Sequence, residues 1–182
     1  VGYRADQVEA ALGDGGRWGM RFTYVHDGPV LLGTGGAIHR ALAHLGDAFF
    51  VMYGDSYLEC DFAAVEAAFR GSGRSGLMTV FRIEGLFDIS NVEFADGRIV
   101  RYDKKARTPA MRHIDWGLGV LKASAFARYP AGEPLDLARV YQDLLAADEL
   151  TGYEVSNRFY EIGSPEGLAE TDAYLRGRPG VL

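Results

Sequence analysis

Apolar residues recur along this chain with two spacings, which predict different elements. Positions repeating at i, i+3, i+4 and i+7 predict a helix with one buried face, as for Ile38, Ala41, Leu42 and Leu45. Short continuous apolar runs predict strands covered on both faces. The first predicted helix covers Asp6–Leu12, with Asp6 as its N-cap and Gly13 as its end, and a second helix follows the glycines of 33–36. A third begins at Asp61 and buries Phe62, Val65 and Phe69, and a fourth lies near Leu135–Leu145 and buries Leu137, Val140, Tyr141, Leu144 and Leu145. A fifth helix has Ser164 as its N-cap and Pro165 as its first residue.

Strands are predicted between these helices. They cover Met20–Val25, Phe49–Tyr53, Leu77–Phe81, Asn91–Phe94, Arg98–Asp103, Ile114–Leu121 and Phe159–Gly163. The run 49–81 reads as strand, helix and parallel strand, a unit that crosses over right-handed. Asp96-Gly97 between two strand-like runs predicts a hairpin. We expect an α/β fold, with a Rossmann-like, mostly parallel sheet flanked by helices and extended by an antiparallel hairpin.

Composition limits the classes of protein that fit. The 182 residues suffice for a single domain, 1–182, and 48% of them are hydrophobic, which is typical of a globular domain. Ten Tyr, ten Phe and two Trp residues exclude a disordered chain. The net charge of −6 argues against nucleic acid as a partner. The one cysteine suits a reducing compartment, so we expect a cytoplasmic protein. No apolar run reaches the ~20 residues that span a bilayer, so no membrane association is expected.

Two acidic residues stand at predicted strand ends, where ligands bind in open α/β sheets. Asp55 follows the strand Phe49–Tyr53, after Gly54, which allows a close approach to the backbone. Glu161 ends a later strand, just before a helix. Together they are candidates to hold Mg²⁺, which takes one or two carboxylates plus phosphate oxygens. The alternatives stay open: Asp55 as a turn or cap residue, and Glu161 as a partner of the helix dipole.

Two further segments offer weaker signals. Gly33-Thr34-Gly35-Gly36 precedes a helix, whose free N–H groups suit an anionic or base-edge ligand, although a flexible connection explains the glycines as well. Tyr102-Asp103-Lys104-Lys105 places lysines beside a carboxylate, which suits a phosphate or a plain solvated surface. His39 and His44 are five positions apart and diverge around a helix, which argues against zinc.

Four segments, in order, resemble the sugar-1-phosphate nucleotidyltransferases, most closely those acting on mannose-like or heptose-like 1-phosphates. They are Leu32-Gly33-Thr34-Gly35-Gly36-Ala37, Phe50-Val51-Met52-Tyr53-Gly54-Asp55, Asp115-Trp116-Gly117-Leu118 and Tyr160-Glu161-Ile162-Gly163-Ser164-Pro165. The resemblance implies the nucleotide-diphospho-sugar transferase fold. It also implies a Mg²⁺-dependent reaction in which a sugar 1-phosphate attacks the α-phosphorus of a nucleoside triphosphate and pyrophosphate leaves.

The resemblance assigns roles to residues. It places Gly33, Thr34 and Gly54 at the nucleotide, and Asp55 and Glu161 on the metal. Asp55, Glu161 and Lys105 would be catalytic. The sugar-phosphate site would contain Asn91, Asp103, Lys104, Lys105, Asp115 and Gly117. GTP is the first expectation among the four nucleoside triphosphates, and a homo-oligomer is among the expected assemblies.

The chain also departs from the family. Lys104 stands where members have a glutamate, Glu161 where they have an aspartate, and Asp115-Trp116 where many have Asn-Ala. The N-terminal strand and glycine-rich loop of the family are missing, which predicts an exposed strand edge. Since the sequence begins at Val1, we expect a fragment or a chain whose beginning is not represented.

Two alternative functions stay open, the first because of these departures and the second because such proteins share the α/β architecture. One is a non-catalytic module that binds or senses nucleotide-sugars with the same fold. The other is a metal-dependent glycosyltransferase, but Asp55-Ser56-Tyr57 lacks the second aspartate of the Asp-x-Asp usual in those enzymes.

Overall fold

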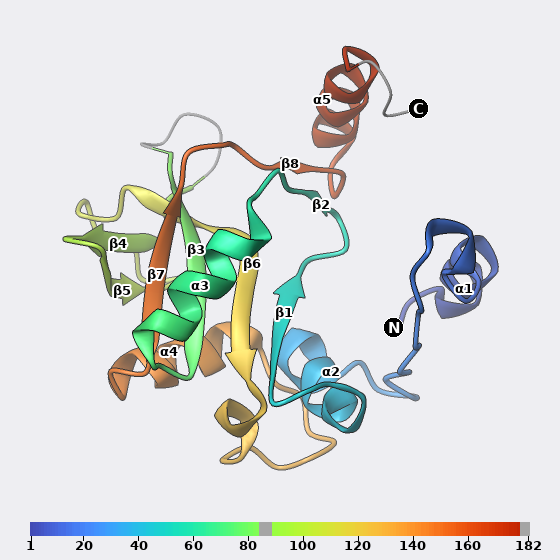
Figure 1. Ribbon diagram of the computed structural model, residues 1–182, viewed down its shortest axis with the longest axis horizontal. Helices are drawn as coiled ribbons and strands as arrows, with labels where there is room; N and C mark the ends of the chain where they lie inside the picture. The colour runs from blue at the N-terminus through green and yellow to red at the C-terminus, as the bar shows by residue number, and fades with distance from the viewer. Residues whose placement is uncertain (84–88, 179–182) are drawn as a thin grey trace.

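The structure, a computed structural model, describes residues 1–83 and 89–178. Its elements in chain order are α1 (Ala5–Leu12), η1 (Gly16–Trp18), α2 (Gly33–Ala41), η2 (Leu42–His44), β1 (Ala48–Met52), β2 (Ser56–Tyr57), α3 (Phe62–Ser72), β3 (Gly76–Arg82), β4 (Val92–Ala95), β5 (Arg98–Tyr102), β6 (His113–Lys122), η3 (Ala123–Phe126), α4 (Leu137–Ala146), β7 (Leu150–Val155), β8 (Tyr160–Glu161) and α5 (Pro165–Arg176). The fold is α/β, with a mixed central sheet flanked by helices (Figure 1).

The long strand β6 is the centre of this sheet. Among the described strands the order is β5-β4-β6-β3-β7, and β1 also pairs with β6. The last five residues of β6 pair with β1 and His113 pairs with β4, while β3 runs antiparallel along the other side. Of the described pairings, β3 with β7 is the parallel one. The prediction of a mostly parallel sheet is therefore wrong, because β6 separates β1 from β3, although β1, β3 and β7 point the same way.

The two faces of the sheet bury separate cores (Figure 1). On one face α3 contributes Val65 and Phe69, which pack with alternate residues of β6, namely Trp116, Leu118 and Val120. On the other face α4 contributes Val140, Tyr141 and Leu144, as predicted. Gly119 of β6 allows this second contact, since a Cβ there would lie 2.1 Å from the hydroxyl of Tyr141.

Several predicted elements are confirmed. The Asp96-Gly97 hairpin joins β4 to β5, with both residues at positive φ (50° and 74°), as a tight hairpin turn requires. Asp61 caps α3 by accepting a hydrogen bond from the N–H of Ala64. Ser164 caps α5, and Pro165 is its first residue.

Other predictions are wrong at the level of single residues. The N-cap of α1 is Arg4 in the left-handed region, not Asp6. Phe62 is 43% exposed because its ring lies against that of Phe50 in the edge strand β1, which is itself exposed. Leu45 lies beyond α2 and is also exposed. The strand β7 has no counterpart among the predicted strands. A weak strand signal was present, in which two sets of residues alternate: Leu150, Gly152 and Glu154 with Thr151, Tyr153 and Val155.

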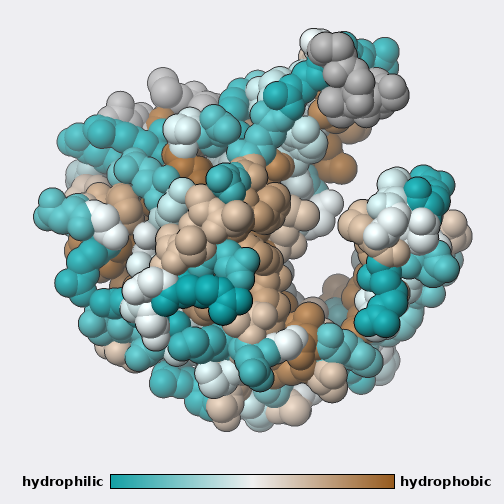
Figure 2. Space-filling view, in the orientation of Figure 1, coloured by the Kyte–Doolittle hydropathy of each residue, from teal (hydrophilic) through white to brown (hydrophobic). Residues whose placement is uncertain are grey.

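Residues 1–31 form an N-terminal arm whose helix α1 stands apart from the sheet (Figure 1). No residue of α1 is buried, and Figure 2 shows the arm standing across an open hollow from α5. Met20–Val25 forms no strand because no other described strand lies beside it, and Phe22 instead donates its N–H to the carbonyl of Asp14.

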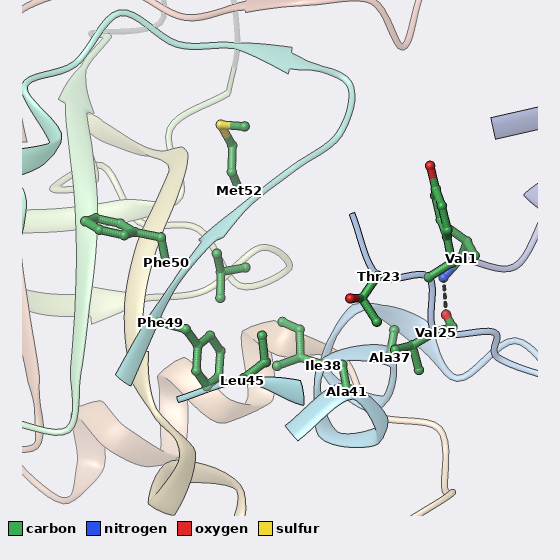
Figure 3. A pocket seen from close by; sticks show the side chains of 12 residues that line it. Val1, Thr23, Val25, Ala37, Ile38, Ala41, Leu45, Phe49, Phe50 and Met52 are labelled. Atoms are coloured by element: carbon green, nitrogen blue, oxygen red, sulfur yellow. Dashed lines mark hydrogen bonds between the residues drawn. The ribbon is translucent and has the colours of Figure 1, made fainter. Parts of the chain in front are cut away.

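The strand β1 forms an edge of the sheet in the described structure, as the resemblance predicted. Its residues alternate between exposed and half-buried, so the prediction that both faces are covered is wrong. Beside this edge lies an apolar cavity of about 330 Å³. Figure 3 shows Phe49 of β1 and Ile38 of α2 on one side of it, with Val1 and Val25 of the arm opposite.

Candidate functional site

A short ribbon of two strands brings Asp55 and Glu161 together. After β1 the chain turns at Gly54-Asp55 and enters β2, which pairs antiparallel with β8 in the register Ser56 opposite Glu161. The N–H of Ile162 donates to the carbonyl oxygen of Asp55 at 2.9 Å, which fixes the two segments beside each other.

The carboxylates of these two residues face one point in space. A Cβ atom added to Gly163 would lie 2.9 Å from Oε2 of Glu161 and 3.3 Å from Oδ2 of Asp55. The absent side chain of Gly163 therefore leaves room beside both carboxylates. Because Asp55 is exposed and Glu161 is half-buried, the pair is open to a ligand from solvent.

This pair fits a hard divalent cation. Two carboxylate oxygens with room between them form the donor set that Mg²⁺ takes together with phosphate oxygens and water. Within residues 1–83 and 89–178 there is no group of three or more His, Cys, Asp or Glu residues arranged to hold a metal. The ribbon therefore suits a metal that shares its coordination with a phosphate ligand rather than one fully enclosed by the protein.

Glu161 also has hydrogen-bond partners at the start of α5. They agree with the alternative in which Glu161 interacts with the beginning of a helix. Its Oε2 accepts the N–H of Gly163 at 2.5 Å, and its Oε1 accepts the hydroxyl of Ser164 at 2.8 Å. Its backbone carbonyl accepts the hydroxyl of Thr171 at 3.0 Å. The side chain is therefore held in place at the start of α5.

A cavity of about 190 Å³, lined by both polar and apolar side chains, opens next to this ribbon. Its lining comes from the turn after β1, from the start of β6, from the segments that flank the hairpin, and from the chain before β8. The lining residues are Tyr53, Ser56, Asn91, Lys104, Ile114, Asp115, Trp116, Gly117 and Phe159. Asn91, Lys104, Asp115 and Gly117, all proposed from the sequence for the sugar phosphate, are thus brought to one cavity.

Asp115 is the best-anchored polar group of this cavity. Its N–H donates to Oδ1 of Asn91 at 3.0 Å, and its own Oδ1 accepts the N–H of Gly117 at 3.1 Å. Burial raises the pKa of Asp115, while the bond from Gly117 and the charge of Lys104 act to lower it. The Asp115 carboxylate is therefore a hydrogen-bond acceptor held in a partly desolvated site.

Tyrosines surround Asp115, and the sequence reasoning gave them no role. The hydroxyl of Tyr102 lies 3.4 Å from Oδ2 of Asp115. Burial, followed by the charge of Asp115, raises the pKa values of Tyr53 and Tyr102. These phenols therefore stay protonated and can donate. The position of Tyr53, at a strand end directly before Gly54-Asp55, was the sequence signal that could have indicated it as a site residue.

The two lysines are placed differently. Both lysines are exposed, but Lys104 lines the cavity and lies near enough to Asp115 to act on its pKa, whereas Lys105 is not among the lining residues. Asp103 accepts the N–H groups of Ala106 and Lys105, both at 2.8 Å, and these bonds lower its pKa. One oxygen of Asp103 therefore stabilises the turn that carries both lysines.

The glycine-rich segment packs against the chain that precedes α4. The N–H groups of Gly35 and Gly36 donate to the carbonyl of Leu135 at 2.9 and 3.0 Å, so these two are not free for an anion, contrary to the expectation for this helix start. Thr34 accepts the N–H of Leu137 through its hydroxyl at 3.1 Å. Gly33, at φ 69°, and Thr34 remain exposed.

The start of α2 nevertheless lies on the same side of the molecule as the cavity. Gly33 approaches the carbonyl of Leu135, and the neighbouring Asp136 is close enough to raise the pKa of Tyr53. Tyr53 lines the cavity, so the start of α2, the cavity and the Asp55–Glu161 pair lie in succession near the end of β1.

The chain resembles known proteins in sequence and in fold. No family model matches the chain. A curated protein, "Glucose-1-phosphate thymidylyltransferase" from Streptomyces antibioticus, is 33% identical over 113 residues. That match covers 60% of this chain and 31% of the relative, so it spans about a third of the relative's length.

Solved structures share the fold. A structure described as a putative glucose-1-phosphate thymidylyltransferase from Bacillus anthracis superposes with a TM-score of 0.82 at 19% identity, over 96% of this chain and 73% of that chain. The inositol-1-phosphate CTP transferase from T. maritima gives 0.77 at 22% identity, over 100% and 76%. The comparisons confirm the nucleotidyltransferase fold and the resemblance to sugar-1-phosphate nucleotidyltransferases. No described helix is long and apolar enough to cross a membrane.

Proposed function

We propose that this chain, which resembles the sugar-1-phosphate nucleotidyltransferases in sequence and shares their fold, is part of an enzyme of that class. The reaction joins a nucleoside triphosphate and a sugar 1-phosphate to give a nucleotide-sugar and pyrophosphate. The observation that carries this proposal is the meeting of Asp55 and Glu161 at one point beside Gly163. Two carboxylates at that point suit a reaction in which all the reacting groups are phosphates.

Such a transfer needs positioning and neutralisation of charge more than covalent catalysis. A phosphate oxygen of the sugar 1-phosphate attacks the α-phosphorus, the bond to the β-phosphate breaks, and pyrophosphate leaves with the electron pair. Asp55 and Glu161 would hold Mg²⁺, which supplies positive charge to the phosphate oxygens when bound.

The cavity beside the ribbon would take the sugar phosphate. Asp115 accepts hydrogen bonds from sugar hydroxyls, and Asn91 holds the backbone of Asp115 in place. Lys104 is the positively charged side chain that lines the cavity, so we assign to it the contact with the phosphate of the sugar 1-phosphate. Lys105, which the resemblance made catalytic, and Asp103 serve this site through the turn that they share.

The nucleotide would lie against Gly33, Thr34 and Gly54 at the start of α2 and the end of β1. GTP is the triphosphate we propose, on the resemblance to mannose- and heptose-1-phosphate enzymes. The names of the relatives specify thymidylyl and cytidylyl transfer instead, so the base has to be measured. We further propose a cytoplasmic enzyme, for which the single cysteine argues, and a homo-oligomeric assembly on the resemblance alone.

The test is release of pyrophosphate by the protein expressed from its full reading frame. Glucose, mannose and heptose 1-phosphates are each offered with the four nucleoside triphosphates, with and without Mg²⁺. Asp55→Asn and Glu161→Gln are expected to abolish turnover, while Glu166→Gln, on the exposed first turn of α5, leaves it unchanged. No turnover by a folded protein with any pair rejects the proposal. Binding of nucleotide-sugars without Mg²⁺, measured by calorimetry, would then favour a non-catalytic module.

A further inference from the structure

Glu161 is joined to the first turn of α5 by a chain of hydrogen bonds. The N–H of Gly167 donates to the hydroxyl oxygen of Ser164 at 2.9 Å, and that hydroxyl donates to Oε1 of Glu161 at 2.8 Å. The N–H of Gly163 holds the other carboxylate oxygen at 2.5 Å. Ser164 therefore has two functions: it caps the helix as an acceptor and it orients the carboxylate as a donor.

The backbone of Glu161 is fixed to the same helix. A Cβ added to Gly167 would lie 2.1 Å from Oε1 and 2.6 Å from the carbonyl oxygen of Glu161, so the helix start and this residue are in close contact. Thr171, one turn further along α5 and 5% exposed, donates its hydroxyl to the same carbonyl. The side-chain carboxylate and the backbone carbonyl of Glu161 are therefore both held by hydrogen bonds from the N-cap and the body of α5.

The attachment of α5 to the ribbon supports this arrangement. The rings of Tyr160 in β8 and Tyr174 in α5 stack with centroids 3.9 Å apart. The hydroxyl of Tyr174 donates to Oε2 of Glu59 at 2.7 Å. The helix that orients Glu161 is therefore held against the residue that precedes Glu161 in the chain.

A glutamate is longer than an aspartate by one methylene and has one more rotatable bond, so it loses more conformational freedom when it binds a cation. Hydrogen bonds from Gly163 and Ser164 restrict that freedom before the cation arrives. Each carboxylate oxygen has two lone pairs, so an oxygen that accepts one hydrogen bond still has one for a metal. The restraint and the coordination are compatible.

We propose that Ser164 is a positioning residue that holds Glu161 in the orientation required to bind a divalent cation with Asp55. This inference rests on the proposed function, because it takes the Asp55–Glu161 pair as the metal site. It goes beyond that function by assigning to the cap hydroxyl of α5 a second role, which the sequence shows only as a helix cap.

The test measures binding of Mn²⁺ alone to the full chain by electron paramagnetic resonance. Ser164→Thr keeps both donor and acceptor and should bind Mn²⁺ within about twofold of the wild type. Ser164→Ala and Ser164→Gly remove the donor and should weaken binding by about 10- to 100-fold, the usual effect of losing a group that orients a metal ligand. Ser164→Gly disturbs the helix less, because glycine is a tolerated N-cap, and it keeps the test valid if Ser164→Ala unfolds.

A matched control separates capping from positioning. Asp61 caps α3 through the N–H of Ala64 at 3.0 Å, and none of its hydrogen bonds involves Glu161. Asp61→Ala should lower the melting temperature about as much as Ser164→Ala while leaving Mn²⁺ binding within about twofold. Wild-type affinity in both Ser164→Ala and Ser164→Gly overturns the inference alone. If the wild type binds no Mn²⁺, or if Asp55→Asn and Glu161→Gln bind it unchanged, the metal site and the proposed function fail with it.

Discussion

The backbone N–H of Ile162 donates to the carbonyl oxygen of Asp55 at 2.9 Å, which sets the side chain of Glu161 beside that of Asp55. The bond continues the two-residue pairing of β2 with β8 and belongs to no larger sheet. A ribbon this short is stabilised mainly by what packs on it, so α5 and its contacts maintain the geometry of the candidate metal site.

Filling the space beside the carboxylates should impair cation binding. In Gly163→Ala the new methyl would lie 2.9 Å from Oε2 of Glu161 and 3.3 Å from Oδ2 of Asp55, so at least one carboxylate must move. We expect Mn²⁺ affinity to fall by about tenfold or more, within the range seen when metal ligands lose their orientation.

Gly71→Ala is the control for that substitution. Gly71 lies in α3 with nothing within 4 Å of an added Cβ. Alanine there should raise the free energy of unfolding by about 0.5–1 kcal/mol and leave Mn²⁺ binding unchanged. Equal Mn²⁺ affinity in Gly163→Ala and the wild type would show that the space beside Gly163 is not the cation site.

The two lysines of the turn after β5 should differ in their effect on the sugar phosphate. Lys104→Ala removes the cation that lines the cavity and should raise KM for the sugar 1-phosphate by about tenfold or more, the cost of one charge-assisted hydrogen bond. Lys105→Ala, at an exposed position outside the lining, should change KM by less than about threefold. Steady-state kinetics with both variants decides the assignment, and the opposite ranking would restore Lys105 as the phosphate contact.

Stability should respond to pH through Asp148. Its carboxylate lies 2.7 Å from Arg74 and 2.9 Å from Arg98, and the bond from Arg74 is the main cause of its lowered pKa. A pKa that is lower in the folded state stabilises the fold above the unfolded value of about 3.9, and that contribution is lost as the pH falls through the folded value.

Asp148→Asn removes this pH-dependent contribution and keeps a residue that tolerates the φ of 56°. The variant should be less stable than the wild type at pH 7, and the two should converge as the pH falls below 3.9, the approximate unfolded pKa. Urea unfolding at several pH values measures the difference. A gap between the two proteins that stays constant with pH would contradict the assignment.

The close approach of α4 to the sheet should make Gly119 intolerant of a side chain. A Cβ there would lie 2.1 Å from the hydroxyl of Tyr141 and 3.0 Å from the carbonyl oxygen of Leu77. Gly119→Ala should destabilise the protein by about 1–3 kcal/mol, as overpacking a core does. In a Tyr141→Phe background the penalty should be smaller, since the nearest atom is gone, and a double-mutant cycle measures this coupling. Strict additivity would show that the contact with Tyr141 is not the cause.

The sequence by itself determined the local elements that have local causes. Asp61 and Ser164 mark helix starts because each side chain accepts a hydrogen bond from the N–H group three residues ahead. The Asp96-Gly97 turn is specified by residues that tolerate positive φ. The sequence also indicated Asp55 and Glu161 as site residues, because each acidic residue stands at the end of an apolar run that predicts a strand.

Only the tertiary structure decided how these elements pair. The apolar run of β1 looks the same whether β6 or a parallel strand lies beside it, so the insertion of antiparallel β6 could not be inferred from the run. The surroundings of Asp115 likewise depend on distant segments, since Asn91, Tyr102 and Lys104 reach it from outside β6. The reason is physical: hydrophobic periodicity records which side of a segment is buried, while the identity of the neighbour is set by long-range packing that no local pattern contains.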